Sequence, residues 1–428
     1  MDWEAAMLKL IVMTITYKTL IILALSLSLL SCQQDKSIHS VTDIPRLMER
    51  TAALHYGQEW TNLQNSFAEL SARASRDIDD INSRISLAQI YIREARITGE
   101  HGHYYPVALD VLDQILDNEG RDKDQEFLAQ SLKAGVLLSL HQFPKALETA
   151  SAAVKLNPFN AQIYGVLVDA HVEMGDYRTA IEMADKMVSI RPDLRSYARV
   201  SYLREIHGMP EESIEAMEMA VAAGFPSYEE TSWAKVTLSK LYRDIGDVER
   251  AEAILERILI ERPNYPFAIA EQANLAFERG DSELAIDLLD QAIGVIPEVG
   301  FNIKLAEVYD YMGLQQEKAE VIEDVLAMLE DDEASGHKMA MEFAYVYGHL
   351  SGNNQRALEY LIEEYEIRPG NIDVNRMLAE IYLNLENWER ARYHWEIASQ
   401  TGSRHPELEA IQERLAKAEG QNSEAGSI

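Results

Sequence analysis

Apolar and polar residues follow a helical period along almost the whole chain after residue 43. Apolar positions recur every three to four residues, and the strict alternation that marks a half-buried strand is absent. Glycine and proline interrupt this pattern at regular intervals. The pattern therefore predicts an all-α chain of short helices that are joined by tight turns.

The interruptions repeat with a period of 34 residues. Pro158 and Pro192 are separated by this distance, and so are Gly246 and Gly280. The stretches LYRDIGDVERAEAILERILIERP and LAFERGDSELAIDLLDQAIGVIP align without a gap and share a glycine, an alanine and a closing proline. Self-similarity at one fixed period is the signature of a repeat architecture.

Each repeat unit is predicted to be a pair of antiparallel helices. The glycine ends the first helix, the small alanine lets the two helices approach closely, and the proline breaks the chain before the next unit. The spacing and the residues resemble the tetratricopeptide repeat, a 34-residue helix–turn–helix unit. This resemblance implies a right-handed superhelical solenoid whose first helices line a concave surface.

The resemblance covers about eight units and indicates the domain boundaries. We expect the solenoid at 81–404, preceded by an N-terminal helical segment at 43–80 and closed by a capping helix at 405–419. Such caps are needed because the end units of an array have no neighbour to cover them. The first unit has about eight added residues, ITGEHGHY, in its predicted turn, and residues 420–428 are predicted to be a disordered tail.

The only cysteine, Cys32, follows an uncharged apolar and serine run at 19–31, which Lys18 precedes. A positive charge before a short apolar core is typical of a secretory signal, whereas a membrane-spanning helix needs about 20 apolar residues. The sequence LLSC at the end of this run resembles the lipobox of bacterial lipoproteins. The alternatives are an N-terminal membrane helix at 8–30 with an incidental cysteine, and a later start at Met7 or Met13.

The lipobox resemblance implies that residues 1–31 are a signal peptide, that Cys32 carries the lipid, and that residues 32–42 form a tether. It also implies a lipid-anchored protein of the bacterial cell envelope. Gln33 stands where an aspartate would favour the inner membrane, so we expect the outer membrane, with the protein facing the periplasm.

The composition argues against several classes of function. The chain has 39 basic and 71 acidic residues and a net charge of −32, which repels phosphate backbones and excludes a nucleic-acid partner. It contains no glycine-rich phosphate loop, HExxH motif or nucleophile elbow. His101 and His103 offer only two imidazoles, one residue apart. We therefore expect no cofactor, no metal and no enzyme activity.

The candidate protein-binding residues lie on the first helices of two central units. In the tetratricopeptide family the second, fifth, ninth and twelfth residues of this helix face the groove, and this spacing places them on one helical stripe. We call the eight matching residues the inner-face set. They are Trp233, Val236, Lys240 and Arg243 in one unit and Phe267, Ala270, Asn274 and Phe277 in the next.

Aromatic and arginine side chains are typical of binding hot spots, and this set is basic within an acidic chain. The alternative is that the aromatic rings pack between units while Lys240 and Arg243 pair with neighbouring glutamates. The lysine-and-asparagine clamp for C-terminal carboxylates that some family members use is incomplete in the neighbouring units, so we predict no such clamp.

These features predict a non-catalytic scaffold or adaptor that binds other envelope proteins or peptide segments. The lipid on Cys32 would hold it to the membrane. The alternative is a repeat component of an outer-membrane machine for the export or assembly of protein or polysaccharide.

Overall fold

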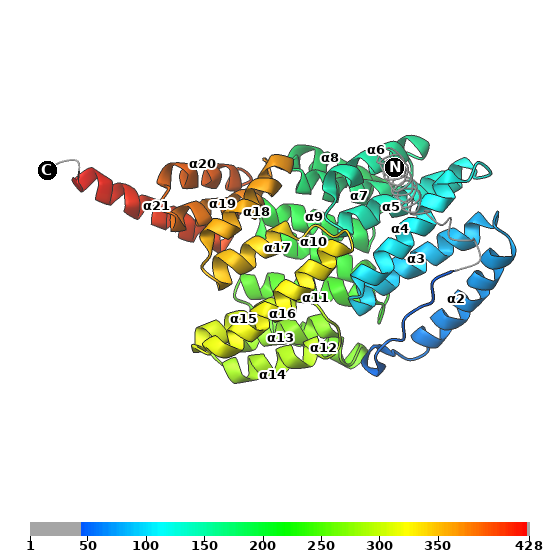
Figure 1. Ribbon diagram of the computed structural model, residues 1–428, viewed down its shortest axis with the longest axis horizontal. Coiled ribbons are helices and arrows are strands. Elements are labelled where there is room, and N and C mark those ends of the chain that lie inside the picture. Colours follow the sequence, from blue (N-terminus) through cyan, green and yellow to red (C-terminus); the bar gives the residue numbers. More distant parts are fainter. Residues whose placement is uncertain (1–43, 426–428) are drawn as a thin grey trace, which may run out of the picture.

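The computed structural model describes residues 44–425, and every regular element within them is a helix. Helices α3 to α20 form nine consecutive pairs, where the sequence predicts about eight units. We call the link within a pair a turn and the link between two pairs a joint. The all-α solenoid of helix pairs is thus confirmed, and Figure 1 shows its path.

The bounds of the helices, in chain order, are η1 (Ala52–Leu54), α2 (Glu59–Arg76), α3 (Ile81–Thr98), α4 (His101–Asp117), α5 (Lys123–Ser139), α6 (Phe143–Leu156), α7 (Ala161–Glu173), α8 (Tyr177–Ile190), α9 (Leu194–Ile206), α10 (Pro210–Ala223), α11 (Glu229–Asp244), α12 (Val248–Glu261), α13 (Pro266–Glu278), α14 (Ser282–Ile293), α15 (Val299–Met312), α16 (Gln315–Ala334), α17 (Ala340–Tyr345), η2 (Val346–Leu350), α18 (Asn354–Ile367), α19 (Ile372–Asn384), α20 (Trp388–Ala398) and α21 (Pro406–Ala425).

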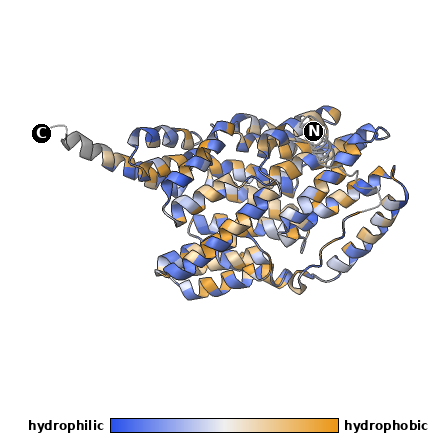
Figure 2. Ribbon diagram, in the orientation of Figure 1, coloured by the Kyte–Doolittle hydropathy of each residue, from blue (hydrophilic) through white to orange (hydrophobic). Residues whose placement is uncertain are grey.

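The pair α13–α14 shows how the repeat sequence forms its local structure. Gly280 adopts a left-handed φ of +84° in the turn, a conformation that glycine reaches without steric cost. Asp281 then caps α14 by accepting a hydrogen bond from the Leu284 amide at 3.2 Å. Ala285 is fully buried between the helices, as its small size predicts. Figure 2 shows polar and apolar residues mixed along the helices, and in α14 the buried residues recur every three to four positions on one face, at Ser282, Ala285, Leu289 and Ala292.

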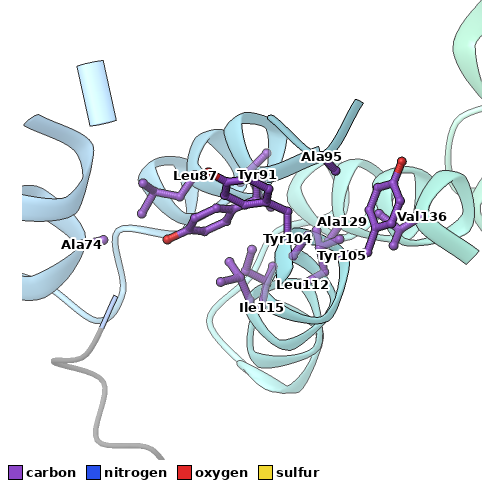
Figure 3. Packing of buried hydrophobic residues seen from close by; sticks show 14 of the residues in the cluster. Ala74, Leu87, Tyr91, Ala95, Tyr104, Tyr105, Leu112, Ile115, Ala129 and Val136 are labelled. Atoms are coloured by element: carbon purple, nitrogen blue, oxygen red, sulfur yellow. The ribbon is translucent and has the colours of Figure 1, made fainter. Parts of the chain in front are cut away.

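The first pair differs from its prediction. Helix α3 continues to Thr98 and α4 begins at His101, so the added residues ITGEHGHY lengthen the two helices instead of enlarging the turn. The reason is that Tyr104 and Tyr105, at the start of α4, are both buried in the N-terminal core, where Tyr104 packs near Tyr91 and Tyr105 lies toward Val136 (Figure 3). A helical start of α4 is required to place both rings in that core.

The N-terminal segment predicted to be helical at 43–80 contains the helix α2, but the described residues that precede α2 are mostly not helical. Residues 44–58, which we call the strap, contain only the short helix η1 and otherwise follow an extended path. Tyr91 donates a hydrogen bond to the Pro45 carbonyl at 2.5 Å, and the Met48 amide donates one to the Tyr104 hydroxyl at 2.9 Å. Because side chains of α3 and α4 satisfy backbone groups of the strap, it does not need helical hydrogen bonds of its own.

At the other end of the chain, α21 continues past residue 419, where the sequence predicts its end. No helix between residues 44 and 425 is long and apolar enough to cross a membrane. The predicted signal peptide, Cys32 and the tether to residue 42 lie outside the described residues.

Successive coils of the superhelix contact each other, because turns of the first four pairs touch joints of later pairs or the link that follows the last pair. We call this line of contacts the seam. In Figure 1, α16 lies beside α4, which belongs to the preceding coil. The contacts are Gly99 against Pro297, Gln142 Nε2 to the Gly336 carbonyl at 2.8 Å, Asn371 Nδ2 to the Glu173 carbonyl at 3.0 Å, and Gly208 against Gly402.

The seam has a nearly constant register. The two hydrogen bonds join residues 194 and 198 positions apart, and the ion pair between Glu59 and Arg262 spans 203 positions. This ion pair continues the seam toward the N-terminus by one repeat unit. Glu59 lies just after the strap, and Arg262 lies at the α12–α13 joint. One full coil of the solenoid therefore contains slightly fewer than six units of 34 residues.

Replacing Gly175 with alanine is expected to open the seam locally. A Cβ at this position would lie 2.3 Å from the backbone carbon of Gly370, whereas a Cβ at Gly246 has nothing within 4 Å. The two glycines have almost the same φ, +79° and +81°, so both alanine variants carry the same conformational cost. We expect Gly175→Ala to lower the free energy of unfolding by about 1–3 kcal/mol more than Gly246→Ala, the usual cost of overpacking. Urea denaturation measures this difference, and equal losses would contradict the seam.

Candidate functional site

The inner-face residues of α11 differ in their exposure. Val236 is buried in the core, whereas the Trp233 side chain remains 45% exposed and Lys240 is exposed. Arg243 is half-buried and forms ion pairs with Glu271 and, at 3.4 Å, with Glu278, both on α13. The stripe on α11 therefore offers an exposed indole and an exposed ammonium group, while its guanidinium is already paired.

The inner-face residues of α13 make contacts within the chain. Ala270 is buried in a cluster that also contains Leu54 of the strap, and Asn274 donates a hydrogen bond to Glu271 at 2.9 Å. The Phe267 ring lies 5.6 Å from that of Phe301, measured between centroids. These contacts join neighbouring units and the strap.

The last inner-face residue of α13, Phe277, lies edge-on to Tyr311, with the ring centroids 5.2 Å apart. The Lys304 ammonium lies 4.7 Å from the centroid of the same Phe277 ring. Both partners come from α15, and Tyr311 is strongly exposed. Phe277 thus packs between neighbouring units, as the alternative to a binding role predicts. The exposed Tyr311 ring and the Lys304 ammonium group still lie next to it.

Carboxylates surround the basic groups of the inner-face set. Burial, followed by the nearby charge of Asp244, raises the pKa of Glu205 to about 6, and Lys240 acts in the opposite direction. Burial likewise raises the pKa of Glu271, although Arg243 and Lys240 lower it. The region is therefore not the isolated positive patch that the sequence suggests, because the chain supplies its own acidic partners there.

The position of one of these carboxylates, Glu205, could have been predicted from the alignment of the repeat units. Glu205 lies three residues before the turn residue Gly208, as Arg243 lies three residues before Gly246. The two side chains thus occupy the same repeat position in successive pairs. A position-by-position comparison of the units would have identified an acidic neighbour for the basic stripe. Whether the inner-face set binds a partner stays a prediction.

Of the two histidines named in the sequence analysis, His101 lies at the seam. His101 lies near His337, with 6.2 Å between ring centroids, and His141 lies 4.5 Å from His337. Burial, followed by the charge of His141, lowers the pKa of His337 to about 3. His103 instead packs edge-on against Tyr104. Within residues 44–425, no three histidine, cysteine, aspartate or glutamate side chains are arranged to hold a metal ion.

Comparison with known proteins identifies the repeats. Residues 131–195 and 236–298 match the tetratricopeptide repeat family model. The small glutamine-rich tetratricopeptide repeat-containing protein 2 of Saccharomyces cerevisiae is 30% identical over 101 residues, which cover 23% of this chain and 28% of that protein. The chain thus spans less than a third of the length of this curated relative.

Several solved structures match this chain at low sequence identity and with TM-scores below 0.5. The APC/C hetero-tetramer Cut9–Hcn1 has a TM-score of 0.44 at 13% identity, over 85% of this chain and 64% of that chain. Human IFIT1 has a TM-score of 0.44 at 14% identity, over 81% of this chain and 88% of that chain. The type IV pilus biogenesis factor PilW has a TM-score of 0.39 at 19% identity, over 47% of this chain and 93% of that chain.

Proposed function

We propose that this protein, whose residues 131–195 and 236–298 are tetratricopeptide repeats, is a non-catalytic scaffold that is lipid-anchored in the bacterial cell envelope. Its partners are segments of other envelope proteins. The repeats support the binding role, because stacked helix pairs present an extended surface to a partner. The lipobox-like sequence before Cys32 supports the anchor.

The observation that carries the binding proposal is the exposed Trp233 on the stripe that also contains Lys240. An indole that remains 45% exposed on a helix of the array has apolar surface left for a partner to cover. Tryptophan is among the residues that contribute most to binding energy at protein interfaces. Because Glu205 and Glu271 already lie near Lys240, the site suits a segment with one apolar anchor and mixed polar groups.

The proposal is tested by affinity capture of partners with wild type and a Trp233→Ala, Lys240→Glu variant. Both side chains are exposed, so the variant is expected to keep its helicity by circular dichroism. Loss of a hot spot of about 2 kcal/mol lowers the affinity about 30-fold, so the partner should almost disappear from the captured fraction.

The matched control is Phe225→Ala with Lys417→Glu, which removes an exposed ring in the α10–α11 joint and an exposed ammonium on α21, neither of them on the groove-facing stripe of α11. This control should recover the partner in the same amount as wild type. Undiminished recovery by the Trp233→Ala, Lys240→Glu variant would contradict the assignment of the binding face.

A further inference from the structure

Three arginines occupy the same position at the ends of second helices. Arg191, Arg262 and Arg368 end α8, α12 and α18, and a proline follows each of them. All three leave the helical conformation with similar φ values of −150°, −135° and −138°, and each amide donates to the carbonyl four residues earlier. The repeat therefore places three guanidinium groups at equivalent joints.

At the α12–α13 joint, Arg262 is covered by the N-terminal part of the chain. The guanidinium lies 3.8 Å from the centroid of the Tyr56 ring, and Nη1 donates to Glu59 Oε2 at 3.3 Å. The residue is only 1% exposed as a result. Nη1 also donates to the Ser227 carbonyl at 2.8 Å, so an aromatic ring, a glutamate three positions later and one backbone carbonyl contact this guanidinium.

At the α18–α19 joint, different segments supply the same two chemical groups to Arg368. The guanidinium lies 4.7 Å from the centroid of the Phe143 ring at the start of α6. Its Nη1 donates to Oε2 of Glu173, at the end of α7, at 2.5 Å. Arg368 is 5% exposed. An aromatic ring and a carboxylate therefore cover the arginine in both cases, although the covering segments are unrelated in sequence.

At the α8–α9 joint, no segment between residues 44 and 425 covers Arg191 in this way. Its side chain is 74% exposed and pairs with Asp193 at 2.9 Å, an exposed ion pair of the weak kind. Beside it lies a cleft of about 290 Å³ that Phe159, Met187 and Arg195 help to line. Phe159 is 80% exposed. The joint thus has an exposed arginine beside a partly apolar cleft.

We infer that the α8–α9 joint docks a partner segment that presents an aromatic ring and a glutamate with the spacing of Tyr56 and Glu59. The ring stacks on the Arg191 guanidinium, a favourable cation–π arrangement, and the carboxylate replaces Asp193. The inference rests on the proposed scaffold role and adds a second binding face with a defined ligand chemistry. The net charge of −32 makes copies of this chain repel one another, which favours a different protein as the occupant.

The test uses a fluorescein-labelled peptide of residues 50–61, RTAALHYGQEWT, titrated with the full-length protein and followed by fluorescence anisotropy. We expect saturable binding by wild type and at least a tenfold loss of affinity for Arg191→Glu. A peptide with Glu59→Lys should recover binding to Arg191→Glu, because the charges at the pair are then exchanged. Arg178→Glu is the control, since Arg178 is on the same helix with a 92% exposed side chain and should not change the affinity.

Absence of binding by wild type, or equal affinity for wild type and Arg191→Glu, would overturn the inference. Self-association that requires Arg191, seen by sedimentation velocity without peptide binding, would also overturn it and assign the joint to a second copy. The Trp233→Ala, Lys240→Glu variant should bind the peptide normally. A failure of the inner-face binding proposal is therefore distinguishable from a failure at this joint.

Discussion

Replacing Cys32 with serine should abolish metabolic labelling with an alkyne analogue of palmitate. The proposed anchor is bonded to the only thiol in the chain, and a serine hydroxyl does not replace that sulfur in the lipid transfer. Stable membrane attachment takes two acyl chains, since each buried methylene contributes only about 0.8 kcal/mol. Labelling of immunoprecipitated protein measures this outcome directly, and membrane fractionation supports it.

The control for this experiment is Ser37→Ala in the predicted tether, which should keep wild-type labelling. A Cys32→Ser protein that stays in the membrane without label would carry an uncleaved signal peptide, and this result is compatible with the lipoprotein proposal. Labelling of Cys32→Ser at the wild-type level would refute it.

Glu94→Ala is expected to give a large loss of stability. The Glu94 carboxylate receives two hydrogen bonds from Arg50, from Nη2 at 2.6 Å and from Nε at 2.8 Å, and both side chains are fully buried. Removing the carboxylate leaves a buried guanidinium without its main acceptor. Breaking a buried pair in this way typically costs about 3–5 kcal/mol. The measurement is the midpoint of urea unfolding, read by circular dichroism.

The comparison variant is Glu69→Ala on α2, where the side chain is exposed and a change within about 0.5 kcal/mol is usual. If Glu94→Ala and Glu69→Ala unfold at the same urea concentration, Arg50 does not fasten the strap to α3. A Glu94→Gln variant should lie between the two, because the amide oxygen still accepts one hydrogen bond.

The helix pairs are predictable because their determinants are local. Gly246 and Gly280 adopt the left-handed φ that ends a first helix, and Ala251 and Ala285 are fully buried where the paired helices cross. Glu386 adopts the same left-handed φ, +57°, without being a glycine, so the turn forms even where the repeat pattern loses its glycine. Each of these features depends on a few adjacent residues, and a sequence pattern records them directly.

The seam is not predictable in the same way, because its partners are almost 200 positions apart. Nothing in the sequence around Gln142 indicates that its side chain will bond the Gly336 carbonyl, since a backbone acceptor carries no residue signature. The extended path of the strap is unpredictable for the same reason, because it depends on distant side chains such as Tyr91 on α3, which donates a hydrogen bond to the Pro45 carbonyl. The 34-residue period describes how one unit packs on the next. It does not determine how many units make one coil, and the seam depends on that number.

Binding by the inner-face set stays a prediction, whereas the charge distribution around it differs from the isolated positive patch that the sequence suggests. The register places Trp233 and Lys240 on one stripe of α11, as the structure shows. It also places Arg243 there, but the ion pair of Arg243 with Glu271 involves an acidic residue outside the groove-facing positions. Charge balance in the folded chain therefore depends on positions that the family pattern ignores.

The seam also constrains how the protein is made on the ribosome. An array whose units touch only their sequence neighbours completes each unit soon after it is synthesised. Here Gln142 meets its acceptor only after a further 194 residues have been added. At 5–20 residues per second, this delay is about 10–40 s. The first coil therefore emerges with one edge uncovered, and the nascent chain has to remain soluble until the second coil folds against it.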